Sequence, residues 1–91
     1  MMDNTTQRLI MTPTIHSNGS SAKSLAGGYR EAYSAVSSAI AALQQAYPNA
    51  RDYYMQGQHA YAMAHAEHKG RVRKLSDVAR DLITLFEACN K

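Results

Sequence analysis

The sequence has 91 residues, of which 45% are hydrophobic, and it carries a formal net charge of +3. A chain of this length forms one domain and buries only about 60–65% of its unfolded surface, so many such chains gain burial from a partner. The charge is too small for a dedicated duplex-DNA binder, the single Cys89 excludes an internal disulfide, and no run of about 18 apolar residues is present to span a membrane.

Residues 1–13 are expected to form a flexible N-terminal segment, ahead of a single domain over residues 14–91. Arg8–Ile15 places β-branched and apolar residues around Pro13. This pattern predicts an extended segment or a short edge strand, because proline cannot donate to a β-ladder. The segment has no apolar stretch followed by a cleavage site, so we expect no secretory signal. Together with the lone cysteine, this favours a reducing, cytoplasmic setting.

The first helix is predicted to run from about residue 21 to residue 46. Ser20 and Ser21 are good N-cap residues, and Asn18-Gly19 ahead of them signals a turn. Gly27-Gly28 weakens the helix by about 1 kcal/mol per glycine relative to alanine, which is either tolerated or marks the close approach of another chain or a ligand. The apolar seam repeats at alternating spacings of four and three and consists of Leu25, Tyr29, Ala32, Val36, Ala39, Leu43 and Ala46.

A second seam with the same heptad spacing predicts a helix from about residue 58 to residue 89, after a linker that Pro48 opens. The two arms form a long antiparallel hairpin, so the fold class is mainly α. The second arm is longer, and its apolar end Leu82–Phe86 needs cover from residues 11–15 or from another subunit. Because two helices enclose no core, we expect a homo-oligomer. The second seam consists of Tyr61, Ala64, His68, Arg71, Leu75, Val78, Leu82, Leu85 and Cys89.

Polar residues interrupt the second seam at His68 and Arg71. In the antiparallel hairpin these residues are expected to lie opposite Tyr33, Ser34 and Ser37. One interpretation is a mutually satisfied polar layer that fixes the register of the helices. The other is a ligand pocket between the helices. Arg71 could also direct its charged head outward, since only its stem is apolar.

The linker and the start of the first helix each carry a candidate site. Tyr53 and Tyr54 offer two flat faces for stacking on a base, each worth about 1–3 kcal/mol. Arg51 can form a bidentate hydrogen-bonded contact with phosphate or carboxylate. Alternatively, one tyrosine packs on the helix ends and Arg51 pairs with Asp52 or a helix cap. The second candidate is an anion site or an ordinary N-cap, and its residues are Asn18, Ser20, Ser21 and Lys23. Only a head-to-tail neighbour would combine the two candidates into one pocket.

Catalytic and metal chemistry find little support in the sequence. His59, His65 and His68 fall short of a zinc site, which needs four protein ligands, or three and a water. Cys89 has no nearby histidine base, and paired carboxylates and a phosphate-binding loop motif are missing. We therefore expect no enzyme, catalytic residue, metal or cofactor. A basic stretch either contacts nucleic-acid phosphates or is a solvated face, and it consists of Lys69, Arg71, Arg73 and Lys74.

The motifs of the helix start, the linker and the second helix have a recognisable order. They are Ile15-His16, Asn18-Gly19-Ser20-Ser21, Arg51-Asp52-Tyr53-Tyr54, Gln56-Gly57, Glu67-His68 and Arg71. This layout, which covers about residues 14–89, resembles a group of small uncharacterised phage and prophage helical-hairpin proteins. The resemblance implies no established activity. A phage setting does imply counter-defence, by proteins that withhold cyclic nucleotide or ADP-ribose signals or that cap a host protein as anti-CRISPR proteins do.

The leading hypothesis from the sequence is a non-enzymatic homo-oligomer, in the host cytoplasm if phage-encoded, that sequesters a nucleotide-derived immune signal. The tyrosine pair would stack on a base, Arg51 and Arg71 would bind phosphate, and His68 would make a polar contact. The alternatives are a protein–protein inhibitor of a host defence complex and a weak nucleic-acid binder. The expected ligand-binding residues are Asn18, Ser20, Ser21, Lys23, Tyr33, Arg51, Tyr53, Tyr54, His68 and Arg71.

Overall fold

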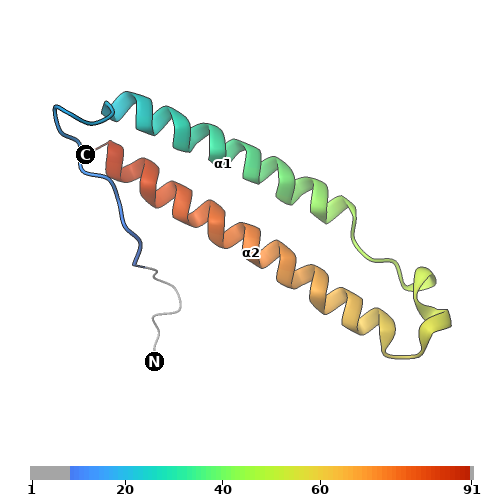
Figure 1. Cartoon of the computed structure of the whole chain (residues 1–91). Coiled ribbons are helices and arrows are strands. Elements are labelled where there is room, and N and C mark those ends of the chain that lie inside the picture. Colours follow the sequence, from blue (N-terminus) through green and yellow to red (C-terminus); the bar gives the residue numbers. More distant parts are fainter. Residues whose placement is uncertain (1–8, 91) are drawn as a thin grey trace.

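The computed structural model describes residues 9–90, which fold into two long antiparallel helices joined by a structured loop (Figure 1). Helix α1 spans Ala22–Gln45 and helix α2 spans Ala60–Cys89. The loop contains two short 3-10 turns, η2 at Ala50–Asp52 and η3 at Tyr54–Gln56. The helices begin and end within two residues of the predicted positions, so the mainly helical hairpin is confirmed.

The N-terminal segment contains no strand in its described part, residues 9–21. The predicted flexible segment, residues 1–13, lies for its first eight residues outside the described residues. Leu9 and Met11 are 101% and 91% exposed, so their side chains do not provide the cover that the sequence predicted for the end of the second helix. The Asn18-Gly19 turn is present, with the Gly19 N–H donating to the carbonyl of His16 at 3.1 Å.

The start of α1 follows directly from its sequence. The hydroxyl oxygen of Ser21 accepts a hydrogen bond from the backbone N–H of Ser24 at 3.0 Å, which satisfies one of the donors left unpaired at a helix start. Ser21 is therefore the N-cap, as one of the two interpretations of this residue predicted. The helix ends at the position expected from Pro48, which disfavours helical geometry in the residue before it.

The register of the two helices differs from the predicted one. The ring of Tyr47, just beyond α1, lies 5.1 Å from the ring of His68, and Tyr33 lines a cavity together with Leu82 and Phe86. His68 therefore faces the end of α1, about three helical turns beyond the predicted serines Ser34 and Ser37. The loop causes this difference in register, because residues 47–59 fold back beside the first turns of α2 and do not form a symmetrical turn between the two helices.

In this register α2 extends beyond α1 at the loop end of the hairpin, whereas the sequence predicted that it would do so at its C-terminal end. The first turns of α2 extend past the end of α1, while the C-terminal end of α2 lies beside the start of α1 (Figure 1). The expected overhang at Leu82–Phe86 was wrong, since Leu82 and Phe86 face Tyr29 and Tyr33 of α1, although Ile83 between them stays 40% exposed.

The heptad seam also shifts around α2 relative to the prediction. Arg71 is exposed where it was expected to face the first helix, and Val78 is 45% exposed. The adjacent Val72 and Ala79 are half-buried in their place. An undistorted α-helix has 3.6 residues per turn, so a strict seven-residue repeat drifts by about 20° per heptad around it. Following the repeat over the whole helix therefore assigned some residues to the wrong side.

The hairpin is a single layer of two helices without an enclosed core. Its principal extents are 61, 32 and 15 Å. Among residues 9–90 only Ala26, His68 and Cys89 are buried, and no large side chain is fully buried. The burial of Cys89 agrees with its predicted place in the seam. Much of the apolar side-chain surface is therefore still accessible on the two faces of the layer.

The glycines inside the helices are not explained by packing within the chain. A Cβ atom added to Gly27, Gly28 or Gly70 would meet nothing within 4 Å. We expect the Gly28→Ala substitution to raise the free energy of unfolding by about 1 kcal/mol, because alanine loses less conformational entropy in a helix. Urea denaturation followed by circular dichroism measures this change.

The control for Gly28→Ala is Gly19→Ala, which should give no gain. A Cβ at Gly19 would lie 2.8 Å from the ring of His16, so the His16 side chain would have to move. A loss of stability in Gly28→Ala would instead mean that another chain packs closely on this turn of α1.

Candidate functional site

Five ring-bearing side chains gather at the loop end of the hairpin, and we call them the aromatic–histidine cluster. The Tyr47 ring is 5.2 Å from that of His65 and 5.1 Å from that of His68, in both cases edge to face. Tyr61 lies 5.8 Å from His65, and Tyr53 of the loop lies 6.5 Å from Tyr61. Edge-to-face and tilted rings at these separations attract one another beyond simple burial.

Helical spacing and the end of α1 assemble this cluster. Tyr61, His65 and His68 recur at intervals of four and three residues, which places them on one side of α2. Tyr47 is the residue before Pro48, and its hydroxyl is hydrogen-bonded to Nε2 of His65. The ring of Tyr47 thereby joins the end of α1 to the early part of α2, while 48% of this residue stays exposed to solvent.

The loop that carries the predicted tyrosine pair has a defined conformation. The side-chain oxygen of Asn49 accepts from the backbone N–H of Arg51 at 3.0 Å and starts η2. Gly57 ends η3 with φ +119° and ψ 164°, a region that residues with a side chain hardly enter. Tyr53 packs beside Tyr61, whereas Tyr54 is 72% exposed. The structure thus separates the pair, with one tyrosine in the cluster and one at the surface.

His68 is the most unusual member of the cluster. It is only 4% exposed, and its Nε2 atom makes no hydrogen bond with any described residue. A buried polar atom without a partner costs about 1–3 kcal/mol. The satisfied polar layer with Ser34 and Ser37 is therefore not formed within this part of the chain, because those serines lie further up α1.

A cavity of about 310 Å³, which we call the basic groove, adjoins the cluster. Lys69 and Arg73 follow one another by four residues and present two cations on the same side of α2. The volume is at the lower end of the range typical of small-molecule sites. The groove is lined by Gln44, Tyr47, His68, Lys69, Val72 and Arg73. Its walls therefore offer an aromatic ring, an imidazole, an amide and two positive charges.

The basic stretch of α2 is divided between two sides of the helix. Arg71, a predicted phosphate ligand, does not line the basic groove; its Nη2 atom lies 3.8 Å from a carboxylate oxygen of Glu67. Both side chains of this pair are about 60% exposed, at 60% and 63%, so the pair adds little stability. The expectation that Arg71 joins His68 in a polar layer was wrong, and the alternative of an outward-pointing guanidinium is confirmed.

The predicted anion site at the helix start lies at the other end of the molecule. Asn18, Ser20 and Lys23 are exposed, and Ser21 serves as the N-cap of α1. The length of α1, about 36 Å, separates these residues from the loop. Within one chain they cannot meet Arg51, Tyr53 or Tyr54, so the composite pocket formed by two neighbouring subunits stays a prediction.

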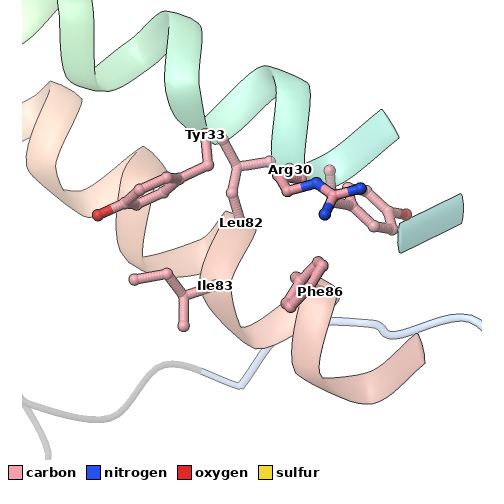
Figure 2. Close-up of a pocket in the computed structure, with 6 residues that line it drawn as sticks. Arg30, Tyr33, Leu82, Ile83 and Phe86 are labelled. Carbon is pink, nitrogen blue, oxygen red and sulfur yellow. The ribbon is translucent and has the colours of Figure 1, made fainter. Parts of the chain in front are cut away.

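Tyr33 belongs to a different cavity from the one the sequence predicted. It borders a cavity of about 280 Å³ between α1 and α2 whose walls are formed mainly by apolar side chains (Figure 2). This cavity lies near the chain's C-terminal end, and His68 does not line it. Tyr33 was therefore wrongly grouped with His68, because the grouping depended on the predicted register.

Sequence reasoning missed the central residue of the cluster, Tyr47, and assigned Lys69 and Arg73 either to a nucleic-acid surface or to a solvated face. Tyr47 lies outside both helical repeats, so periodicity could not find it. One signal was present in the four- and three-residue spacing of Tyr61, His65 and His68, but Tyr61 and His68 were assigned to the apolar seam and His65 was considered only as a metal ligand.

Residues 9–90 contain no group of three or more His, Cys, Asp or Glu side chains placed to hold a metal ion. Over the same range, neither helix combines the length and apolar character needed to cross a membrane. A comparison with known proteins finds no family model that matches the chain, and no curated protein or solved structure that is significantly similar to it.

Proposed function

We propose that this protein is a non-catalytic binding protein that sequesters a small anionic ligand carrying a planar ring. The observation that supports this most directly is the buried His68 with an unpartnered Nε2, which lines a groove that also carries Lys69 and Arg73. A ligand that displaced the side chains covering this atom would give the buried imidazole a partner, and the two cations would form charge-assisted hydrogen bonds with phosphate or carboxylate.

A ring combined with an anionic group is the chemistry of a nucleotide. The half-exposed Tyr47 offers an aromatic surface beside the two cations, and Arg51 and Tyr54 are exposed on the neighbouring loop. Base stacking on a tyrosine contributes about 1–3 kcal/mol. We propose further that the motif order of residues 14–89 marks a small phage or prophage protein, and that the ligand is a nucleotide-derived signal of antiphage defence, either a cyclic oligonucleotide or an ADP-ribose-like molecule.

The test is a thermal-shift screen, followed by calorimetry, with cyclic dinucleotides, cyclic trinucleotides and ADP-ribose isomers. At a ligand concentration 100 times Kd, the wild-type chain should gain about 2.7 kcal/mol of stability. The Lys69→Gln/Arg73→Gln double variant should bind at least about tenfold more weakly, because it loses both charge-assisted contacts. The matched control is Arg71→Gln/Lys74→Gln, which removes the same charge from the same helix outside the groove and should bind like wild type.

Two outcomes would count against the proposal. A wild-type chain that no member of the panel stabilises would remove the nucleotide-like ligand. An equal loss in both double variants, with an oligonucleotide affinity that falls steeply with salt, would identify a nucleic-acid surface instead.

A further inference from the structure

The cavity bordered by Tyr33 lies between the helices at the end of the hairpin away from the loop, and we call it the apolar groove. Figure 2 shows Tyr33 of α1 above Leu82, Ile83 and Phe86 of α2, with Arg30 at its border. Tyr29 completes the lining. Both helices therefore contribute bulky apolar side chains to one face of the layer.

These side chains remain in contact with water in the single chain. Tyr33 is 38% exposed and Ile83 is 40% exposed, although both lie next to other apolar residues of the groove. Removing such surface from water is favourable by about 25 cal/mol per Å². An apolar groove shared by two helices is thus a surface that gains free energy when it is covered.

The total surface indicates how much cover is needed. The chain exposes 7003 Å², about 1,800 Å² more than the roughly 5,200 Å² of a compact monomer of 10.0 kDa. Part of this excess belongs to the N-terminal segment, where Leu9 and Met11 are almost fully exposed. Stable dimer interfaces bury about 800 Å² or more from each partner, so an interface centred on the six residues of the apolar groove must extend along both helices.

We propose that a second copy of this chain docks on the apolar groove, groove against groove, around a twofold axis. Four helices then surround one core, which supplies the enclosed interior that the two-helix layer lacks. Self-association fits because the same apolar side chains meet their own copies. The exposed Arg30 can lay its apolar stem along the rim and keep its guanidinium in water.

The opposite face of the hairpin is a poorer interface. Val78 precedes Ile83 by five residues, so the two side chains project about 140° apart from α2, and Val78 does not line the apolar groove. On α1 the exposed residues turned away from Tyr33 include the small Ala35, Ala39 and Ala42 and the charged Glu31. Each of these buries less apolar area than a tyrosine, isoleucine or phenylalanine, so the face with the groove gains more from contact.

The apolar groove and the basic groove share no lining residue. Tyr33 and Tyr47 are separated by about 21 Å along α1. The two surfaces can therefore be tested separately, and failure of one proposal leaves the other standing.

Sedimentation equilibrium of the full chain, from about 1 to about 100 µM, tests the proposal. Wild type should sediment with twice the 10.0 kDa chain mass. Ile83→Glu should weaken the dimer at least about 100-fold, because it places a charged carboxylate among the apolar side chains of the interface. Val78→Glu is the matched control, since Val78 is similarly exposed on the same helix, and should leave the dimer constant within about threefold. A monomeric wild type, or a larger loss in Val78→Glu than in Ile83→Glu, would overturn the proposal.

A cross-linking measurement covers the case in which Ile83→Glu unfolds. In a Cys89→Ala background, Tyr33→Cys should form a disulfide-linked dimer under mild oxidation, because the twofold arrangement brings this position close to its own copy. Ala39→Cys on the other side of α1 should not. If both cysteines cross-link at the same rate, the groove is not the interface and the proposal is wrong.

Discussion

Replacing Tyr47 with alanine is expected to lower the free energy of unfolding by about 2–3 kcal/mol. Tyr47 makes edge-to-face contacts with His65 and His68, each worth about 0.5–1.5 kcal/mol. Its hydroxyl bond to His65 contributes about 1 kcal/mol. These contributions are reduced somewhat because 48% of Tyr47 faces water. The effect should still be large for a domain with so small an interior.

Two variants separate the contributions of the Tyr47 ring and hydroxyl. Tyr47→Phe keeps both ring contacts and should lose only about 1 kcal/mol, the value of one hydrogen bond. Tyr54→Ala, at a position that is 72% exposed, should stay within about 0.5 kcal/mol of wild type. Chemical denaturation of the three variants at one protein concentration measures these differences. If Tyr47→Ala and Tyr54→Ala were equally mild, the cluster would not hold the loop end together.

The helices and their ends could be predicted because their signals are local. Ser21 caps α1 with its own hydroxyl, Pro48 limits its end, and Asn18-Gly19 forms the expected turn. Apolar residues at helical spacing need no knowledge of the partner helix. These signals would therefore predict the same two helices whatever the packing between them.

The register could not be predicted, because a repeating seam permits several alignments of two helices. Sliding one arm by a few turns still places apolar residues opposite one another. The actual alignment depends on how the loop returns, through two 3-10 turns and Gly57 at positive φ. It also depends on large side chains that fit one position, such as Tyr47 against His68. Neither feature has a period in the sequence.

The error in register also decided which residues of the candidate site were placed correctly. His68 was identified correctly as a polar residue inside an apolar seam, because that contrast is visible along a single helix. Arg71 was placed beside it only because the strict heptad was followed without its drift around the helix. Lys69 and Arg73 were recognised as basic, but their position beside His68 required the correct side of α2.

Replacing His68 with leucine is expected to change stability and ligand binding in opposite directions. Leucine has a similar size and no polar atom, so it removes the unpartnered Nε2, a gain of about 1–3 kcal/mol. It also removes the edge-to-face ring contact with Tyr47, a loss of about 0.5–1.5 kcal/mol, so the free energy of unfolding should rise by about 1 kcal/mol. The same change removes a polar contact from the basic groove, so affinity for the stabilising ligand should fall roughly tenfold or more. A site that costs stability without its ligand is expected where function, and not folding, has fixed the residue.

Denaturation and calorimetry on the same His68→Leu preparation measure both quantities. His59→Leu is the control, because His59 is an exposed histidine at the start of α2 that makes no side-chain cap hydrogen bond, and it should change neither stability nor affinity beyond about 0.5 kcal/mol. A loss of stability in His68→Leu would contradict the prediction. It would mean that Nε2 of His68 is paired in solution by another subunit, and the polar residue would then fix the alignment of helices as a buried asparagine does in a coiled coil.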